Sequence, residues 1–158
     1  MSQYDAYAHA NQKIMEAVAD IYEQGNYVLV YNYELMLVPA LLRKRFPDIK
    51  CGFFMHCLIP PTESFRMLPA RQHFLEGMMG SDLIAFNHFD YVRHFRNAVT
   101  RILGLESKPS RIQYNARVIT IDHYSIGIAP SLFRKSDKVQ EYIDHWRSRF
   151  ENRRVIIS

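Results

Sequence analysis

Cysteine, glycine and long apolar runs are all scarce in this sequence of 158 residues. Cys51 and Cys57 are the two cysteines and do not form a CxxC pair, which argues against a disulfide framework and predicts reduced thiols in a cytoplasmic protein. Six glycines and seven prolines are too few for a fibrous or low-complexity chain. The longest apolar run, residues 35–42, is interrupted by Pro39 and is much shorter than the ~20 residues that span a bilayer. We therefore expect a folded protein with no membrane segment and no secretory signal.

Charge of either sign is also modest. Twenty Lys and Arg against sixteen Asp and Glu give a net charge of +4, which suits a polyanion or a phosphorylated metabolite equally well. No aromatic and basic recognition motif accompanies this charge, so nucleic acid is not an expected partner. With 48% hydrophobic residues, the chain has enough apolar side chains for one core of ordinary size.

Short β-rich runs alternate with helical patterns along most of the chain. Strands that are apolar throughout and separated by helices predict an α/β domain with a parallel sheet and helices on both faces. After Gly104 the alternation stops, and Asn115-Ala116 marks a plausible hairpin. The expected helices are 7–22, 35–46, 68–79, 88–103 and 136–150; the expected strands are 27–31, 51–55, 82–86, the hairpin strands 111–114 and 117–121, and a last run at 155–158.

Polar residues that follow the apolar runs are the candidates for chemistry, because α/β sheets bind ligands at the carboxyl ends of their strands. Asn32 and Tyr33 follow the first run, His56 the second, and Asn87 the third. His56 is the best candidate for a donor to a sugar hydroxyl or carbonyl, and the alternative is a histidine that satisfies loop carbonyls.

The remaining polar motifs favour neither a metal nor a phosphate loop. His88 and His94 are six residues apart and fall on different helix faces, so no metal is expected. No glycine-rich phosphate loop is present in the sequence. A basic helix face either meets phosphate or is simply solvated, and the second reading is favoured. Its residues are Arg93, Arg96, Asn97 and Arg101.

Several longer segments resemble the N-terminal half of trehalose-6-phosphate synthases in order and spacing. They are YNYELMLVPALLRKRFPDIKCGFFMH, IPPTESFRMLPARQHFLEGMMGSDLIAF, DYVRHF, RILGLES and SIGIAPSLF. The resemblance implies a retaining glycosyltransferase of the two-domain Rossmann-like (GT-B) fold, which transfers glucose from UDP-glucose to glucose 6-phosphate without a cofactor or metal. It also implies that His56 contacts the donor glucose and that Asn32 and Tyr33 lie on the acceptor side.

The sequence departs from the family pattern at one of these positions. The family's His-Asp-Tyr-His segment is Tyr31-Asn32-Tyr33-Glu34 here, so Asn32 replaces an acceptor-binding aspartate. An amide offers one neutral oxygen where a carboxylate accepts two charge-assisted bonds, and the difference is roughly 1.5 to 3 kcal/mol of acceptor binding. Smaller departures include Cys57-Leu58-Ile59 for Thr-Pro-Phe and Asn87-His88 for His-Thr.

The resemblance also predicts how the chain is organised. Residues 1–135 are expected to form an incomplete acceptor-side domain, and residues 136–158 a linker helix and the first strand of a nucleotide-sugar domain that is otherwise missing. The Arg and Lys that hold UDP in the family are expected beyond this stretch, so the isolated chain is predicted to be inactive. The alternative prediction is a non-catalytic regulatory or structural subunit of a trehalose synthase complex.

Overall fold

The computed structural model describes residues 2–133, 136–151 and 153–154. The chain separates into two compact units, Met1–Ser125 and Ile126–Ser158. The boundary predicted between residues 135 and 136 stays a prediction about domain organisation.

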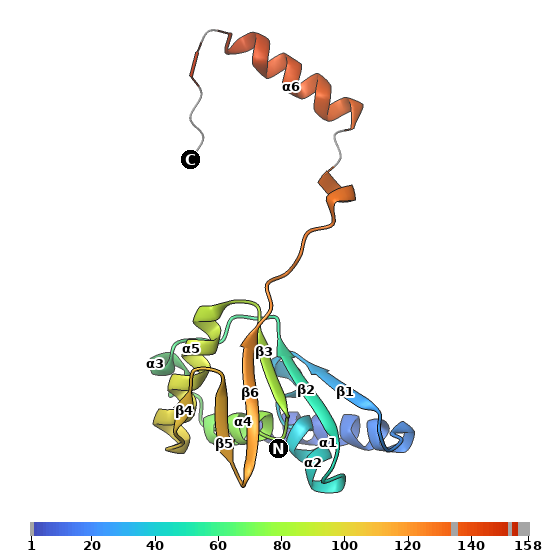
Figure 1. The fold of residues 1–158 in the computed structure, drawn as a ribbon, viewed down its shortest axis with the longest axis vertical. Coiled ribbons are helices and arrows are strands. Elements are labelled where there is room, and N and C mark those ends of the chain that lie inside the picture. The colour runs from blue at the N-terminus through green and yellow to red at the C-terminus, as the bar shows by residue number, and fades with distance from the viewer. Residues whose placement is uncertain (1, 134–135, 152, 155–158) are drawn as a thin grey trace. The chain divides into compact units, whose positions relative to one another are not determined.

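The first unit is built on a six-stranded sheet with the strand order β1-β2-β3-β6-β5-β4 (Figure 1). The first four strands in this order run parallel, whereas β6, β5 and β4 pair antiparallel. The α/β class is therefore confirmed, but the sheet is mixed, because the chain returns at once through the predicted Asn115-Ala116 hairpin. The strands are β1 (Tyr27–Tyr31), β2 (Lys50–Met55), β3 (Leu83–Phe86), β4 (Ser107–Lys108), β5 (Arg111–Tyr114) and β6 (Arg117–His123).

The helices of this unit follow the predicted order with shifted ends. The predicted helix 88–103 changes to a π-helical turn before Gly104, whose φ of +69° ends it in the left-handed region that glycine tolerates. The predicted helix 35–46 is split into a 3₁₀ turn and α2. The elements are α1 (Gln3–Ile21), η1 (Tyr33–Leu35), α2 (Val38–Arg45), α3 (Thr62–Phe65), α4 (Arg71–Met78), α5 (Phe89–Ala98) and the π turn η2 (Val99–Leu103).

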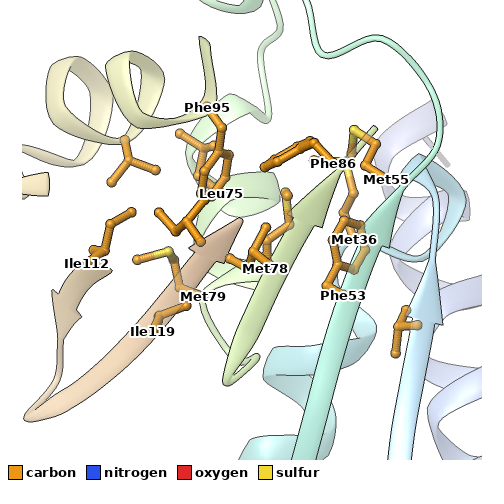
Figure 2. Close-up of a cluster of buried hydrophobic side chains, with 14 of the residues drawn as sticks. Met36, Phe53, Met55, Leu75, Met78, Met79, Phe86, Phe95, Ile112 and Ile119 are labelled. Atoms are coloured by element: carbon orange, nitrogen blue, oxygen red, sulfur yellow. The ribbon is translucent and has the colours of Figure 1, made fainter. Parts of the chain in front are cut away.

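The core lies between the sheet and these helices (Figures 1 and 2). Phe53, Ile84 and Ile121 stand side by side in register on β2, β3 and β6, and each is 1% exposed or less. Leu75 and Phe95 pack on them from α4 and α5 (Figure 2). Because alternate strand residues point to opposite faces, this one face carries most of the buried side chains of the longer strands, and Ala85 of β3 is a buried residue of the other face.

The two faces of the sheet differ, which corrects part of the expected layering. The described helices that contact the sheet do so on the buried face, through α2 on β2 and α5 on β3 and β6. On the opposite face Tyr27, Leu29 and Val118 are 76%, 63% and 54% exposed. Within the described part of the first unit, helices therefore cover one face of the sheet, not two.

Helix α1 buries a different stripe from the one its apolar residues suggest. Ile14 and Ile21, which recur with Ala17 and Val18 at helical spacing in the sequence, are 44% and 79% exposed. Asn11 and Met15 are buried instead, at 1% and 5%. The polar Asn11 sets the rotation of the helix, because its amide reaches the backbone around η1, as described below.

Asp82, just before β3, joins three elements through one carboxylate. Its Oδ1 accepts hydrogen bonds from Arg43 of α2 and Arg117 of β6, both at 2.7 Å, and its Oδ2 accepts from the Cys51 N–H of β2 at 2.8 Å. Burial alone would raise the pKa of Asp82, but these three donors outweigh burial and hold the pKa below its usual value. This cluster fastens the amino ends of the strands, opposite the end where ligands are expected.

The second unit contains a 3₁₀ turn, η3 (Pro130–Phe133), and helix α6 (Asp137–Arg149). The Ser136 hydroxyl caps α6 by accepting from the Val139 N–H, so the helix predicted at residues 136–150 is confirmed. The strand predicted at residues 155–158 lies outside the described residues. Among the described helices of both units, none has the length and apolar content required to cross a membrane.

Candidate functional site

The polar residues after β1, β2 and β3 come together at the carboxyl ends of these strands. Asn32, His56 and Asn87 each follow one strand, and hydrogen bonds connect them in that order. The His56 N–H donates to Asn32 Oδ1 at 2.9 Å, and Asn87 Nδ2 donates to the His56 carbonyl at 2.7 Å. The three strand ends thus form one linked cluster, as the position of these residues in the sequence predicts.

Asn32 occupies an unusual backbone conformation. With φ +65° and ψ 172° it lies outside the left-handed helical region, in a part of the map that is almost restricted to glycine, and its N–H donates to the Phe54 carbonyl at 2.9 Å. Oδ1 already accepts from the His56 N–H, so Asn32 can offer a ligand its NH₂ as a donor and one remaining lone pair of Oδ1 as an acceptor. An aspartate at this position would keep the bond to His56 and offer an acceptor oxygen instead.

The His56 backbone is held on both sides while its ring is exposed. The ring lies near two aromatic side chains of neighbouring strands, stacked on Tyr31 at 5.8 Å and tilted to Phe54 at 4.5 Å between ring centroids. The loop hydrogen bonds use the backbone N–H and C=O of His56, not its imidazole. Among the described residues, the imidazole makes no hydrogen bond to a loop carbonyl, which leaves it available for a ligand.

Tyr33 stands on the 3₁₀ turn directly after Asn32 and is 53% exposed. The neighbouring Glu34 carboxylate raises the pKa of the Tyr33 hydroxyl above its ordinary value, at which the group is already protonated at neutral pH. The Tyr33 carbonyl accepts a 2.6 Å hydrogen bond from the Tyr7 hydroxyl. Helix α1 thus holds the turn that carries Tyr33 through the Tyr7 hydroxyl.

Sequence reasoning missed the two α1 residues that hold this turn. The Tyr7 hydroxyl also accepts from the Met36 N–H at 2.9 Å, and the Asn11 amide donates to the Glu34 carbonyl at 2.9 Å. Asn11 Oδ1 accepts from the Leu37 N–H at 3.2 Å. The sequence held one signal for Asn11: it lies four positions before Met15, so both residues fall on the same face of the helix.

An apolar pocket of about 370 Å³ adjoins Tyr33. It extends from the turn after β1 to the proline-containing loop after β2 and the start of the α4 region. Its lining includes Tyr7, Tyr33, Met55, Leu58 and Phe74. The cluster of polar strand ends therefore has an apolar wall next to it, which is the usual composition of a small-molecule site.

The remaining candidates from the sequence do not join this cluster. His88 caps α5 by accepting from the Asp90 N–H at 3.2 Å. The basic face predicted for this helix is divided among separate partners: Arg93 of α5 pairs with Asp90, Arg96 of α5 donates to the Ser107 carbonyl, and Arg101 of η2 pairs with Glu63.

Parallel strands with polar groups at their carboxyl ends define an open α/β domain of the class that binds ligands at this edge of the sheet. Comparison with known proteins specifies the family: glycosyltransferase family 20 matches residues 1–158, and the chain belongs to it. The UDP-forming alpha,alpha-trehalose-phosphate synthase of Schizosaccharomyces pombe is 37% identical over 161 residues, covering 98% of this chain and 31% of the yeast protein. The chain spans about a third or less of the length of such curated relatives.

The chain is also similar to several solved structures of the same fold. The N-terminal domain of Candida albicans trehalose-6-phosphate phosphatase has a TM-score of 0.81 and 28% identity, covering 94% of this chain and 33% of that chain. An Escherichia coli structure described as bound with UDP-2-fluoro glucose has a TM-score of 0.79 at 20% identity, over 91% of this chain and 34% of that one. A synthase of Burkholderia xenovorans in complex with glucose-6-phosphate has a TM-score of 0.77 at 18% identity, over 92% and 35%. The predicted GT-B resemblance is thereby confirmed, while the roles of His56, Asn32 and Tyr33 remain predictions.

Proposed function

We propose that this chain supplies the acceptor side of a cytoplasmic trehalose-6-phosphate synthase that moves glucose from UDP-glucose to glucose 6-phosphate. His56 would contact the donor glucose, and Asn32 and Tyr33 would face the acceptor. The family's chemistry needs no metal or cofactor, and none is proposed. The observation that carries the proposal is the linked cluster Asn32–His56–Asn87 at the strand ends of a family 20 chain.

The cluster supports this role through its rigidity. Two hydrogen bonds fix the His56 backbone, and three contacts from α1 fix the turn with Tyr33. Groups held in this way bind a sugar without first losing conformational freedom, which lowers the cost of binding. The exposed imidazole then donates to or accepts from a sugar hydroxyl.

A chimeric enzyme tests the proposal. Residues 2–133 of this chain replace the matching segment of the Schizosaccharomyces pombe synthase, and UDP release is measured with UDP-glucose and glucose 6-phosphate. We expect turnover that His56→Ala lowers by about 100-fold, because a hydrogen bond made in the transition state contributes several kcal/mol. His9→Ala, at an exposed position on α1, is the matched control and should leave the rate unchanged.

In the same chimera, Asn32→Asp should lower the KM for glucose 6-phosphate by about tenfold or more. The aspartate keeps the bond to the His56 N–H and replaces an N–H donor by an acceptor oxygen for a sugar hydroxyl. Asn97→Asp on the exposed side of α5 adds the same charge away from the site. Equal effects of the two substitutions, or activity that survives His56→Ala, would refute the assignment of the site.

The isolated chain is proposed to be inactive in glucosyl transfer. It spans about a third of the synthase relatives, and transfer requires donor phosphates to be held against the acceptor. UDP release by the purified chain alone, sensitive to His56→Ala, would contradict this proposal.

A non-catalytic subunit is the second candidate function. Two observations favour it: Asn32 stands where the family carries an acceptor-binding aspartate, and the same fold occurs as the N-terminal domain of a Candida albicans phosphatase. A chimera that folds but stays inactive with Asp at position 32, together with co-purification of this chain with an active synthase, would support this candidate.

A further inference from the structure

A second pocket, separate from the strand-end cluster, is lined largely by cationic side chains. It has a volume of about 560 Å³ and lies between the loop before α4 and the π turn after α5. Its lining includes Arg66, Arg71, His73 and Arg101, together with Pro69 and Gln72. Two segments of the chain at least 30 positions apart thus contribute three arginines to one pocket.

The pocket carries more positive charge than its surroundings neutralise. Arg101 forms an ion pair with Glu63 at 2.9 Å, but both side chains are exposed, at 58% and 70%. Arg71 donates to the Leu68 carbonyl at 3.2 Å, a bond that orders the side chain without removing its charge. Among the described residues, no carboxylate lies within ion-pair distance of Arg66.

Convergent like charges raise the energy of the pocket unless an anion compensates them. Arginine forks match the oxygen geometry of a phosphate, which accepts two parallel N–H bonds from one guanidinium. The volume exceeds that of a phosphate group alone and leaves room for the remainder of an ester. Arg101, which the sequence places on a basic helix face, belongs to this pocket and not to a general surface charge.

We propose that this pocket is an anion site for a phosphate dianion, either free or as a small phosphomonoester, with Arg66, Arg71 and Arg101 as its ligands. The site goes beyond the proposed glucosyl transfer and does not include His56, Asn32 or Tyr33. The anion site and the apolar pocket beside Tyr33 share one loop. This loop contributes Arg66 and Pro69 to the anion site and Leu68 to the apolar pocket.

The test is an NMR titration of the ¹⁵N-labelled 158-residue chain at pH 8, with inorganic phosphate in one arm and glucose 6-phosphate in the other, at ionic strength matched with chloride. We expect saturable shifts at Arg66, Arg71 and Arg101 in at least one arm. Tighter binding of the sugar phosphate assigns the pocket to the ester, and tighter binding of inorganic phosphate assigns it to the free ion.

Two variants distinguish specific anion binding in the pocket from a general effect of the protein's net charge. Arg66→Ala should weaken binding by about tenfold, the usual effect of losing one charged hydrogen bond. Arg93→Ala removes an equal charge from an exposed arginine that pairs with Asp90 outside the pocket, and should leave the affinity unchanged. Shifts that do not saturate, or an equal loss in both variants, would overturn the proposal.

The His56→Ala variant distinguishes a failure of the anion-site proposal from a failure of the proposed function. That substitution should lower turnover in the chimera by about 100-fold and leave the phosphate shifts at the arginine pocket intact. Loss of those shifts in His56→Ala would show that the anion binds at the strand ends, and the pocket assignment would then be wrong.

Discussion

The two thiols of the chain lie in opposite environments. Cys51 is buried in β2 at 2% exposure, and burial raises the pKa of its thiol to about 11. Cys57 is exposed on the loop after the same strand. Because the thiolate is the reactive form, the two residues should differ strongly in reactivity.

We expect one fast-reacting thiol per native chain with a disulfide reagent at pH 8, and two in urea. Cys57→Ser should remove the fast phase and leave a single thiol that reacts only as the protein unfolds. Rapid labelling of native Cys57→Ser would show that Cys51 is accessible and that β2 is less well covered than the structure describes.

Asn11 is the polar side chain on which the η1 turn depends most. It is 1% exposed and makes three hydrogen bonds, two as donor and one as acceptor. Asn11→Ala leaves the Glu34 carbonyl and the Leu37 N–H without their partner, and should lower the free energy of unfolding by roughly 2 to 3 kcal/mol.

Urea denaturation followed by circular dichroism measures this change. Asn97→Ala, at an exposed position of α5, provides the control and should cost less than about 0.5 kcal/mol. A similar cost for both substitutions would mean that α1 is not anchored through Asn11.

At the scale of elements, Asp82 connects α2, β2 and β6 and makes stability depend on pH. Its pKa is lowered in the folded protein, so its contribution is complete above the unfolded value of about 3.9 and is lost as the pH falls through the lower folded value. Asp82→Asn should reduce stability at pH 7 by roughly 1 to 2 kcal/mol, a discounted figure because the side chain is 46% exposed.

Urea midpoints measured from pH 7 down to pH 3 test this dependence. The wild-type chain should lose more stability below about pH 4 than Asp82→Asn, since the variant has already lost the ionised group. Asp48→Asn, an exposed carboxylate before β2, is the control and should follow the wild type. Parallel curves for wild type and Asp82→Asn would contradict the assigned role of this carboxylate.

The helices and strands themselves were largely predictable from sequence, because their bounds depend on residues close by in the chain. The strand at Tyr27–Tyr31 has its predicted bounds, because a glycine turn precedes it and a polar residue follows it. The rotation of α1 was not predictable from hydrophobicity, since Asn11 is buried through long-range hydrogen bonds to η1 and Ile14 is exposed. The strand ends identified Asn32 and His56, but the bond between them depends on the register of β1 with β2.

At the scale of the first unit, the uncovered sheet face is the dominant surface feature. Tyr27, Leu29 and Tyr31 of β1 are 76%, 63% and 46% exposed, and Val118 of β6 is 54% exposed on the same face. Strand β1 also lies at the end of the strand order, so one of its backbone edges has no strand partner among the described residues. Apolar faces and open edges of this kind promote association with a second surface.

The purified 158-residue chain should therefore self-associate as its concentration rises, with sedimentation velocity as the measurement. Leu29→Lys places a charge in the middle of the exposed β1 surface and should shift the distribution toward monomer. Ile21→Lys adds the same charge at a residue of α1 that is 79% exposed, away from the sheet, and should leave association unchanged. If the wild-type chain stays monomeric at every concentration, the sheet face does not drive association; if both variants dissociate equally, net charge and not this face controls it.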